Sequence, residues 1–315
     1  MNRLAFTASV MVLGLAGPVM AGSNTSFIEQ IGTGSNATIS QGDTGLGTNN
    51  NSSVKQNGDN HKATITQKGS ANSNKSVVEQ TGDGQRADVD QIGAANVNDS
   101  LIKQKGSENI AIVRQRGDNN TLNKSVIDTQ DGHANQIYLD QFGTANATND
   151  SFAQTIGSNN IIDIKQSGDG NTNKSDARIG VDGNTITVYQ DGNDNKNTST
   201  AKTSVGNVNH LFIEQFGSNN ISDATTDVAG SGNIVNVHQS GINGKNNANT
   251  TIAGANDSLV NITQGGLSND NTADTTITGP GAGNKVTVDQ GGTLNTNVST
   301  VNTTGSSNTV VVSQF

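Results

Sequence analysis

A glutamine returns every 24 to 26 residues along almost the whole chain, and this spacing constrains the fold more than any other feature. The twelve glutamines are Gln41, Gln67, Gln91, Gln115, Gln141, Gln166, Gln190, Gln215, Gln239, Gln264, Gln290 and Gln314. A fixed period of this length is the signature of repeat architectures, in which each unit contacts only its neighbours. We therefore expect one repeated structural unit over residues 22–315.

The residues before each glutamine alternate with a period of two. Ile, Val or Leu lies two residues before it, and Ala, Ile, Leu or Val lies four before it, as in Ala111, Val113 and Gln115. Alternation with β-branched residues predicts a strand, so these side chains share one face and the polar residues between them face outward. Eight units carry an asparagine six residues before the glutamine: Asn109, Asn135, Asn160, Asn184, Asn209, Asn233, Asn284 and Asn308.

A Gly-containing turn precedes and follows each of these strands, as at residues 106–109 and 93–96. Gly and Asn tolerate the backbone angles of tight reversals. Each unit is therefore strand, turn, strand, turn. In the first units, the second strand carries a serine and a glutamine. When the units are aligned on the glycine that follows, the same position holds Gln30, Gln56, Gln80, Gln104 and Gln130. We predict repeats with two Gln ladders over residues 22–174 and Thr-rich repeats with one over residues 175–315.

One such unit buries too little apolar surface to fold alone, so neighbouring units must stack. The sequence predicts an all-β, amyloid-like β-solenoid of about twelve coils, about 58 Å long at the usual spacing of hydrogen-bonded strands. Identical residues then lie above one another inside the stack. Because a side-chain amide both donates and accepts, stacked Gln and Asn residues satisfy each other when buried. The ladders are the predicted assembly residues.

Composition alone favours a different structure. Only 30% of residues are hydrophobic and 3% aromatic, with 38 glycines and no cysteine, which is typical of a disordered chain. The twelvefold spacing argues against permanent disorder. The net charge of −9, without a basic patch, makes nucleic acid or an anionic membrane a poor partner.

The first 21 residues follow another pattern. Arg3 precedes a largely apolar stretch over residues 4–16, and residues 19–21 fit the small-x-small rule for signal cleavage. The apolar stretch is too short and too interrupted to span a bilayer. We predict a signal peptide over residues 1–21, export, and no membrane span elsewhere.

No group of residues predicts catalysis, and we expect neither a metal nor a cofactor. The four histidines at 61, 133, 210 and 238 are expected to be solvated, and no His–carboxylate spacing recurs. The turn aspartates lack the glycine pattern of calcium-binding rolls. The Thr-x-Thr pairs vary too much for an ice-binding array. Strands this short with charged outer faces do not favour an outer-membrane barrel, although the chain ends in Phe315.

The spacing of Gln104, Asn109 and Gln115, and of Gln130, Asn135 and Gln141, resembles the curlin repeat of bacterial curli amyloid subunits. The likeness extends over essentially all of residues 22–315. The resemblance implies a secreted fimbrial subunit that passes an outer-membrane secretion pore. It also implies polymerisation with itself from a nucleator subunit, and a part in biofilm matrix, adhesion and surface colonisation.

Two functional expectations follow. The first is a structural subunit of extracellular fibres that grows by end-to-end strand addition. We expect its Gln-rich N-terminal half to be the better template. The alternative is a monomeric secreted rod that acts as an adhesin or binds a ligand along its regular flank.

Overall fold

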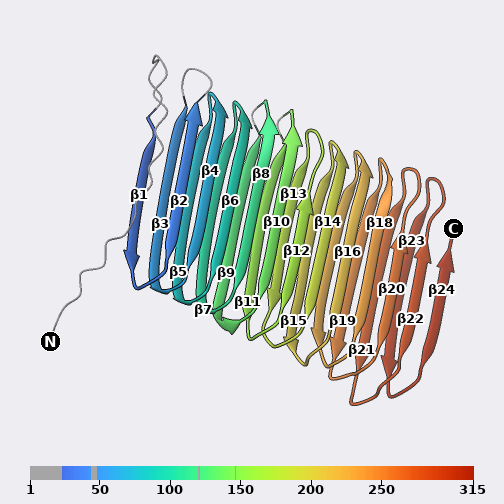
Figure 1. Ribbon diagram of the computed structural model, residues 1–315. Coiled ribbons are helices and arrows are strands. Elements are labelled where there is room, and N and C mark those ends of the chain that lie inside the picture. Colours follow the sequence, from blue (N-terminus) through green and yellow to red (C-terminus); the bar gives the residue numbers. More distant parts are fainter. Residues whose placement is uncertain (1–22, 44–47, 120, 146) are drawn as a thin grey trace.

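The computed structural model describes residues 23–43, 48–119, 121–145 and 147–315, and the predicted signal peptide lies outside these residues. The described residues form 24 β-strands and no helix, arranged in two parallel twelve-stranded sheets (Figure 1). No helix that could span a membrane is present in this part of the chain. The prediction of an all-β solenoid is confirmed.

The odd-numbered strands form the first sheet, here sheet A, and the even-numbered strands form the second, sheet B. Sheet A contains β1 (Thr25–Ile31), β3 (Asn49–Asp59), β5 (Ser73–Asp83), β7 (Val97–Ser107), β9 (Leu122–His133), β11 (Thr148–Ile156), β13 (Thr172–Ile179), β15 (Lys196–Val205), β17 (Ile221–Ala229), β19 (Lys245–Ala253), β21 (Asp270–Thr278) and β23 (Thr296–Thr304). Sheet B contains β2 (Asn36–Asp43), β4 (Lys62–Ser70), β6 (Arg86–Ala94), β8 (Ile110–Asp118), β10 (Gln136–Thr144), β12 (Ile161–Gln166), β14 (Thr185–Asn193), β16 (His210–Ser218), β18 (Ile234–Ile242), β20 (Leu259–Gln264), β22 (Lys285–Gln290) and β24 (Thr309–Gln314).

Each coil of the solenoid is one strand of sheet A followed by one strand of sheet B. The chain then pairs with itself one repeat later: Gln91 of β6 lies beside Gln115 of β8, which lies beside Gln141 of β10. The ribbon advances steadily from β1 to β24, with the first and last coils at opposite ends (Figure 1). Both sheets run on through residues 174 and 175 without interruption.

The strands show the predicted alternation of buried and outward residues. In β8, Ala111, Val113 and Gln115 are buried, whereas Arg114 is exposed. Inward side chains of the two sheets meet in a core only two side chains thick, since packed sheets lie about 10 Å apart. Rows of Ile, Val and Ala fill this core and continue along its length. Complete burial of one Ile or Val side chain contributes about 1.5–3 kcal/mol.

Glycines stack at the turns because successive coils approach too closely there for a side chain. Gly82 has a φ of 121°, and a Cβ built on it would lie 1.8 Å from the carbonyl oxygen of Gly106 in the next coil. Gly58 has the same relation to Gly82. A side chain at these positions forces neighbouring coils apart.

Replacing Gly82 by alanine should lower the free energy of unfolding by roughly 3–5 kcal/mol, because it adds a backbone clash to an unfavourable φ. Gly183 is the matched control, since its φ is 67° but an added Cβ meets nothing within 4 Å. Gly183→Ala should therefore cost only about 1–2 kcal/mol, the price of the left-handed conformation. Chemical denaturation of the two variants measures the difference, and equal losses would contradict the close approach of the coils.

Candidate assembly site: amide ladders and end coils

The twelve periodic glutamines form one unbroken ladder along sheet B. The Nε2 of each donates to the Oε1 of the next at 2.7–3.0 Å. The structure thus brings together Gln41, Gln67, Gln91, Gln115, Gln141, Gln166, Gln190, Gln215, Gln239, Gln264, Gln290 and Gln314. All bonds run in the same direction, so the ladder has an acceptor end at Gln41 and a donor end at Gln314.

In every ladder amide from Gln41 to Gln290, the second N–H is also used. Gln115 accepts from Gln91 at 2.7 Å and donates to Gln141 at 2.9 Å and to the backbone oxygen of Asp99 at 3.1 Å. The ten inner glutamines, 67 to 290, are buried. A buried amide left without partners costs about 1–3 kcal/mol, so the loss of one member destabilises the ladder.

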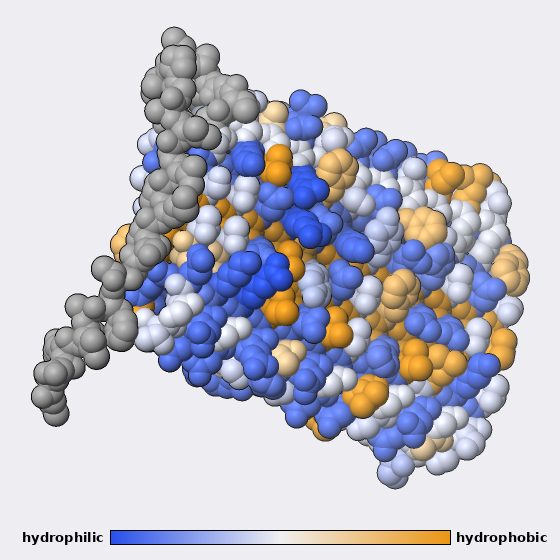
Figure 2. Space-filling view, in the orientation of Figure 1, coloured by the Kyte–Doolittle hydropathy of each residue, from blue (hydrophilic) through white to orange (hydrophobic). Residues whose placement is uncertain are grey.

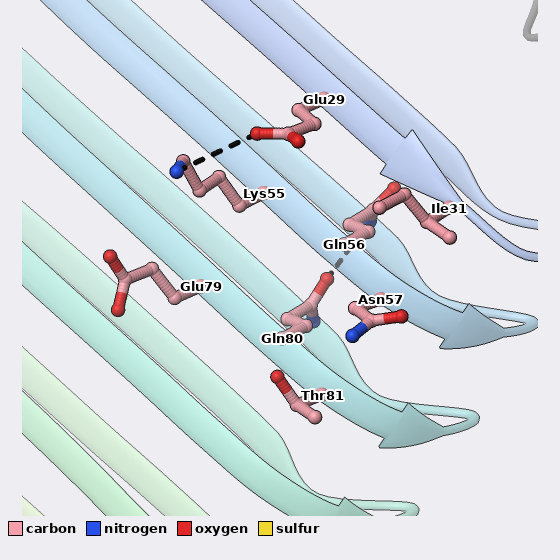
Figure 3. Close-up of a pocket in the computed structure, with 8 residues that line it drawn as sticks. All are labelled: Glu29, Ile31, Lys55, Gln56, Asn57, Glu79, Gln80 and Thr81. Carbon is pink, nitrogen blue, oxygen red and sulfur yellow. Dashed lines mark hydrogen bonds and ion pairs between the residues drawn. The ribbon is translucent and has the colours of Figure 1, made fainter.

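A second, shorter ladder lies in sheet A. Gln30, Gln56, Gln80 and Gln104 are joined in the same direction at 2.6, 2.9 and 2.8 Å. Figure 3 shows Gln56 and Gln80 on adjacent strands with their amides in contact. This ladder ends at Gln104, one unit earlier than the sequence predicts.

Gln130 does not join the ladder. Thr129 takes the slot beside Gln104, and the register shifts by one residue between Gln104 and Gly106. Gln130 is therefore turned out of the core and donates to Asp128 at 2.7 Å. Alignment on the following glycine counted the extra residue of this bulge, which is why the prediction placed Gln130 in the slot. In the later coils, the position that stacks on Gln104 is occupied by Thr129, Thr155, Ile179 and Thr203.

The asparagines that precede the sheet B strands lie at the corner of the solenoid. Except in Asn308 of the last coil, each Oδ1 accepts the backbone N–H of the corner residue in the next coil at 2.9–3.1 Å, and these seven asparagines are buried. These corner residues are Asn109, Asn135, Asn160, Asn184, Asn209, Asn233, Asn284 and Asn308, with Ser258 between the sixth and seventh. Their Nδ2 groups bind turn carbonyls, as Asn109 binds Gly132. They satisfy corner backbone groups that a plain turn would leave buried and unpaired.

Sequence reasoning missed a third ladder, formed by asparagines inside sheet A. The Nδ2 of each donates to the Oδ1 of the preceding one at 2.8–3.0 Å, opposite in direction to the glutamine ladders. Its members are Asn50, Asn74, Asn98, Asn123, Asn149, Asn173 and Asn197 and, after Ser222, Asn246, Asn271 and Asn297. Their own spacing of 24 to 26 residues is the signal that could have revealed it.

His61 corrects the expectation that all four histidines are solvated. It occupies a corner slot between Ser35 and Gln85 and is only 1% exposed. An imidazole ring is one of the larger groups that fit where most coils carry asparagine. No cluster of three metal-binding side chains occurs in the described residues.

The outer faces carry charges arranged along the solenoid axis. On sheet A, Lys55 lies 3.5 Å from Glu29 (Figure 3). Lys103 lies 3.8 Å from Glu79, and all four side chains are about half exposed. On sheet B, partial burial is the largest influence on Asp163 and raises its pKa above the usual range of a carboxyl. Exposed ion pairs such as Lys55–Glu29 and Lys103–Glu79 contribute at most about 1 kcal/mol each to the free energy of unfolding. The face seen in Figure 2 mixes polar and apolar residues.

In the part of the chain that the structure describes, each end coil has one edge without a partner strand. β1 and β2 begin the two sheets, and β23 and β24 end them. Val310 and Val312 of β24 and Ile28 of β1 are only partly buried, whereas the equivalent side chains of inner coils are buried. Partly exposed core side chains therefore lie on β1 and β24, whereas Ala37 and Ile39 of β2 and Val301 of β23 are buried. All four end strands carry backbone groups ready for strand pairing.

Comparison with protein families gives one match. Residues 46–69, which cover β3 and all but the last residue of β4, match the family model of the curlin-associated repeat. Comparison with characterised proteins found no match. One coil of the β-solenoid is therefore similar to the curlin-associated repeat, and the other coils keep the same spacing of 24 to 26 residues.

Proposed function

We propose that the chain is a secreted structural subunit of curli-like extracellular amyloid fibres, which grow by end-to-end addition of strands. The curlin repeat and the solenoid fold favour a structural role rather than an enzymatic one. In this proposal the fibre serves biofilm matrix, adhesion and surface colonisation, as in the curlin family. Export depends on residues 1–21, with an outer-membrane pore and a nucleator subunit as partners.

The observation that carries the proposal is the match between the two end coils. The repeat register places Val310 in the slot of Ala37, Val312 in that of Ile39, and Gln314 in that of Gln41. Laying β24 of one copy beside β2 of another therefore continues the core rows and the glutamine ladder. The new junction has the same chemistry as the eleven steps already within one molecule.

The direction of the ladder decides which ends meet. Gln314 donates to the backbone oxygen of Val298 at 3.0 Å and accepts from Gln290, which leaves its second N–H directed toward the end of the stack. At the other end, no described residue donates to the Oε1 of Gln41. A donor end matches an acceptor end, so head-to-tail stacking is favoured over head-to-head. A head-to-tail contact that does not close into a ring produces an open filament.

Seeded growth of the purified, signal-free protein tests the proposal. A fibre subunit should convert in a concentration-dependent manner, faster with preformed seeds, and electron microscopy should show unbranched fibres. A monomeric adhesin rod would instead fold promptly at any concentration and remain as single particles. That outcome would overturn the fibre proposal in favour of the rod.

We also expect the N-terminal coils to be the better template, because they carry both glutamine ladders. Replacing Gln30, Gln41, Gln56 and Gln67 by alanine should lengthen the thioflavin lag several-fold more than replacing Gln290 and Gln314. Equal lag times for the two sets would contradict this expectation.

A further inference from the structure

The outer face of sheet A carries a row of apolar residues over the N-terminal coils. Val77, Leu101, Val126 and Phe152 lie beside one another on β5, β7, β9 and β11, and all are partly exposed. Phe27, 52% exposed, lies in the same row on β1 and is separated from Val77 by Ser53 on β3. The row ends at Asp176 on β13, whose neighbour Arg178 lies 4.8 Å from the centre of the Phe152 ring.

Charged residues border this row on both sides, and their signs alternate from coil to coil. One border row is Lys75, Asp99, Lys124 and Asp150, and the other is Glu79, Lys103, Asp128 and Gln154. On each of β5, β7 and β9, the residue of one border row and the residue of the other carry opposite charges. Within the described residues, Lys75, Asp99 and Lys124 make no ion pair.

We propose that this face, which we call the lateral face (β1, β3, β5, β7, β9 and β11 of sheet A), pairs with the same face of a second copy lying parallel to it. A twofold axis along the solenoid keeps each coil opposite the same coil of the partner and exchanges the two borders. Lys75 then meets Glu79, Asp99 meets Lys103 and Lys124 meets Asp128, each pair formed twice. The apolar row meets itself at the centre, with charges of opposite sign around it.

The alternative is an antiparallel arrangement of the two copies. Its twofold axis runs along the strand direction between β7 and β9, so Asp99 of one copy faces Lys124 of the other. This antiparallel contact spans only four coils, because the next coil outward would place Lys55 of one copy against Arg178 of the other, and both side chains are positively charged. The parallel arrangement extends over six coils. It places Asn51 opposite Lys55 and keeps Phe27 against its counterpart, so the observations favour it.

The area of the lateral face sets the conditions under which pairing is measurable. Six coils and five residues along each strand give about 500 Å² per copy, below the roughly 800 Å² per partner of a typical stable complex. One pair of molecules is therefore weak. Pairing strengthens when many copies in two fibres meet at once, so the inference rests on the proposed fibre.

Cross-linking of the assembled signal-free chain tests the inference, and the absence of native cysteine makes single-cysteine variants unambiguous. Val77→Cys should give linked dimers with a short bis-maleimide that bridges the gap of about 10 Å between packed sheets. Phe212→Cys, on the outer face of sheet B, is the control and should give at least fivefold fewer. In a mixture of Val77→Cys and Phe152→Cys, dimers linked between the two variants should be the minority, since these sites lie three coils apart.

Charge reversal provides a second test in the Val77→Cys background. Lys103→Glu should lower the dimer yield several-fold because it would face Asp99, and adding Asp99→Lys should restore the yield. Lys202→Glu is the matched control, because Lys202 lies in the same border row but beyond the lateral face. Equal yields for Val77→Cys and Phe212→Cys would overturn the inference, as would a majority of 77–152 links. Electron microscopy of the same samples reports separately on whether fibres form.

Discussion

Replacing Val312 by lysine should slow seeded growth at least about a hundredfold. Val312 lies in a core position that a second molecule would cover, since β24 is the last strand of sheet B in the described residues. In head-to-tail stacking every junction contains one C-terminal coil, so each junction would bury the introduced charge. An unpaired buried charge costs several kcal/mol, and each 1.4 kcal/mol is a factor of ten in an equilibrium constant.

Val311→Lys is the matched control. Val311 is the adjacent residue on the same strand, but it points outward and is 65% exposed. The same charge there should change the growth rate less than about threefold. Thioflavin fluorescence with wild-type seeds measures both variants, and equal rates would show that β24 does not form the junction.

Replacing Gln115 by leucine should lower the free energy of unfolding by about 2–5 kcal/mol. The substitution removes the ladder acceptor of one Gln91 N–H and the ladder donor to the Gln141 Oε1, and both atoms are buried. Each such group costs about 1–3 kcal/mol. The loss of one amide in the middle of the ladder therefore weakens two further coils.

Gln130→Leu is the control for this prediction, because sequence spacing places Gln130 in a ladder and the structure places it outside. Gln130 bonds only to Asp128 on the outer face. Its replacement should cost less than about 1 kcal/mol. Chemical denaturation of the soluble folded chain compares the two variants, and a similar loss for both would contradict the bulge at the end of β9.

The sequence predicts the solenoid well because its two periods are physical requirements of the fold. The period of two in Ala111, Val113 and Gln115 follows from strand geometry, and the period near 25 follows from stacking like residues. The long glutamine ladder was predictable for the same reason. Its chemistry requires the same residue in every coil.

The errors in prediction occur where the backbone departs from this regularity. A single extra residue in β9 turns Gln130 outward, and nothing in the composition of the turn separates it from an ordinary reversal. The asparagine ladder of sheet A was missed because the other inward positions of its strands vary from coil to coil, although the asparagines themselves recur every 24 to 26 residues. His61 appeared solvated because histidine is rarely used where asparagine bonds the corner. Periodicity predicts which residues stack, whereas local insertions decide which way they point.

The two proposed contacts use different surfaces and carry out different steps. End coils lengthen one filament through core slots and the glutamine ladder. The lateral face joins two filaments through an apolar row with charged borders, and this row exists only over the first six coils. Each filament therefore offers a lateral contact once per subunit.

Electron cryo-microscopy of fibres grown from the signal-free protein is the most direct test of head-to-tail stacking. Twelve coils at about 4.8 Å each predict an axial repeat of about 58 Å per subunit, with β24 of one copy in register beside β2 of the next. The strands should remain parallel across the junction, with Gln314 within hydrogen-bonding distance of Gln41. Fibres in which like ends meet, or in which subunits are rebuilt into flat stacked chains with a 4.8 Å repeat per molecule, would contradict the account.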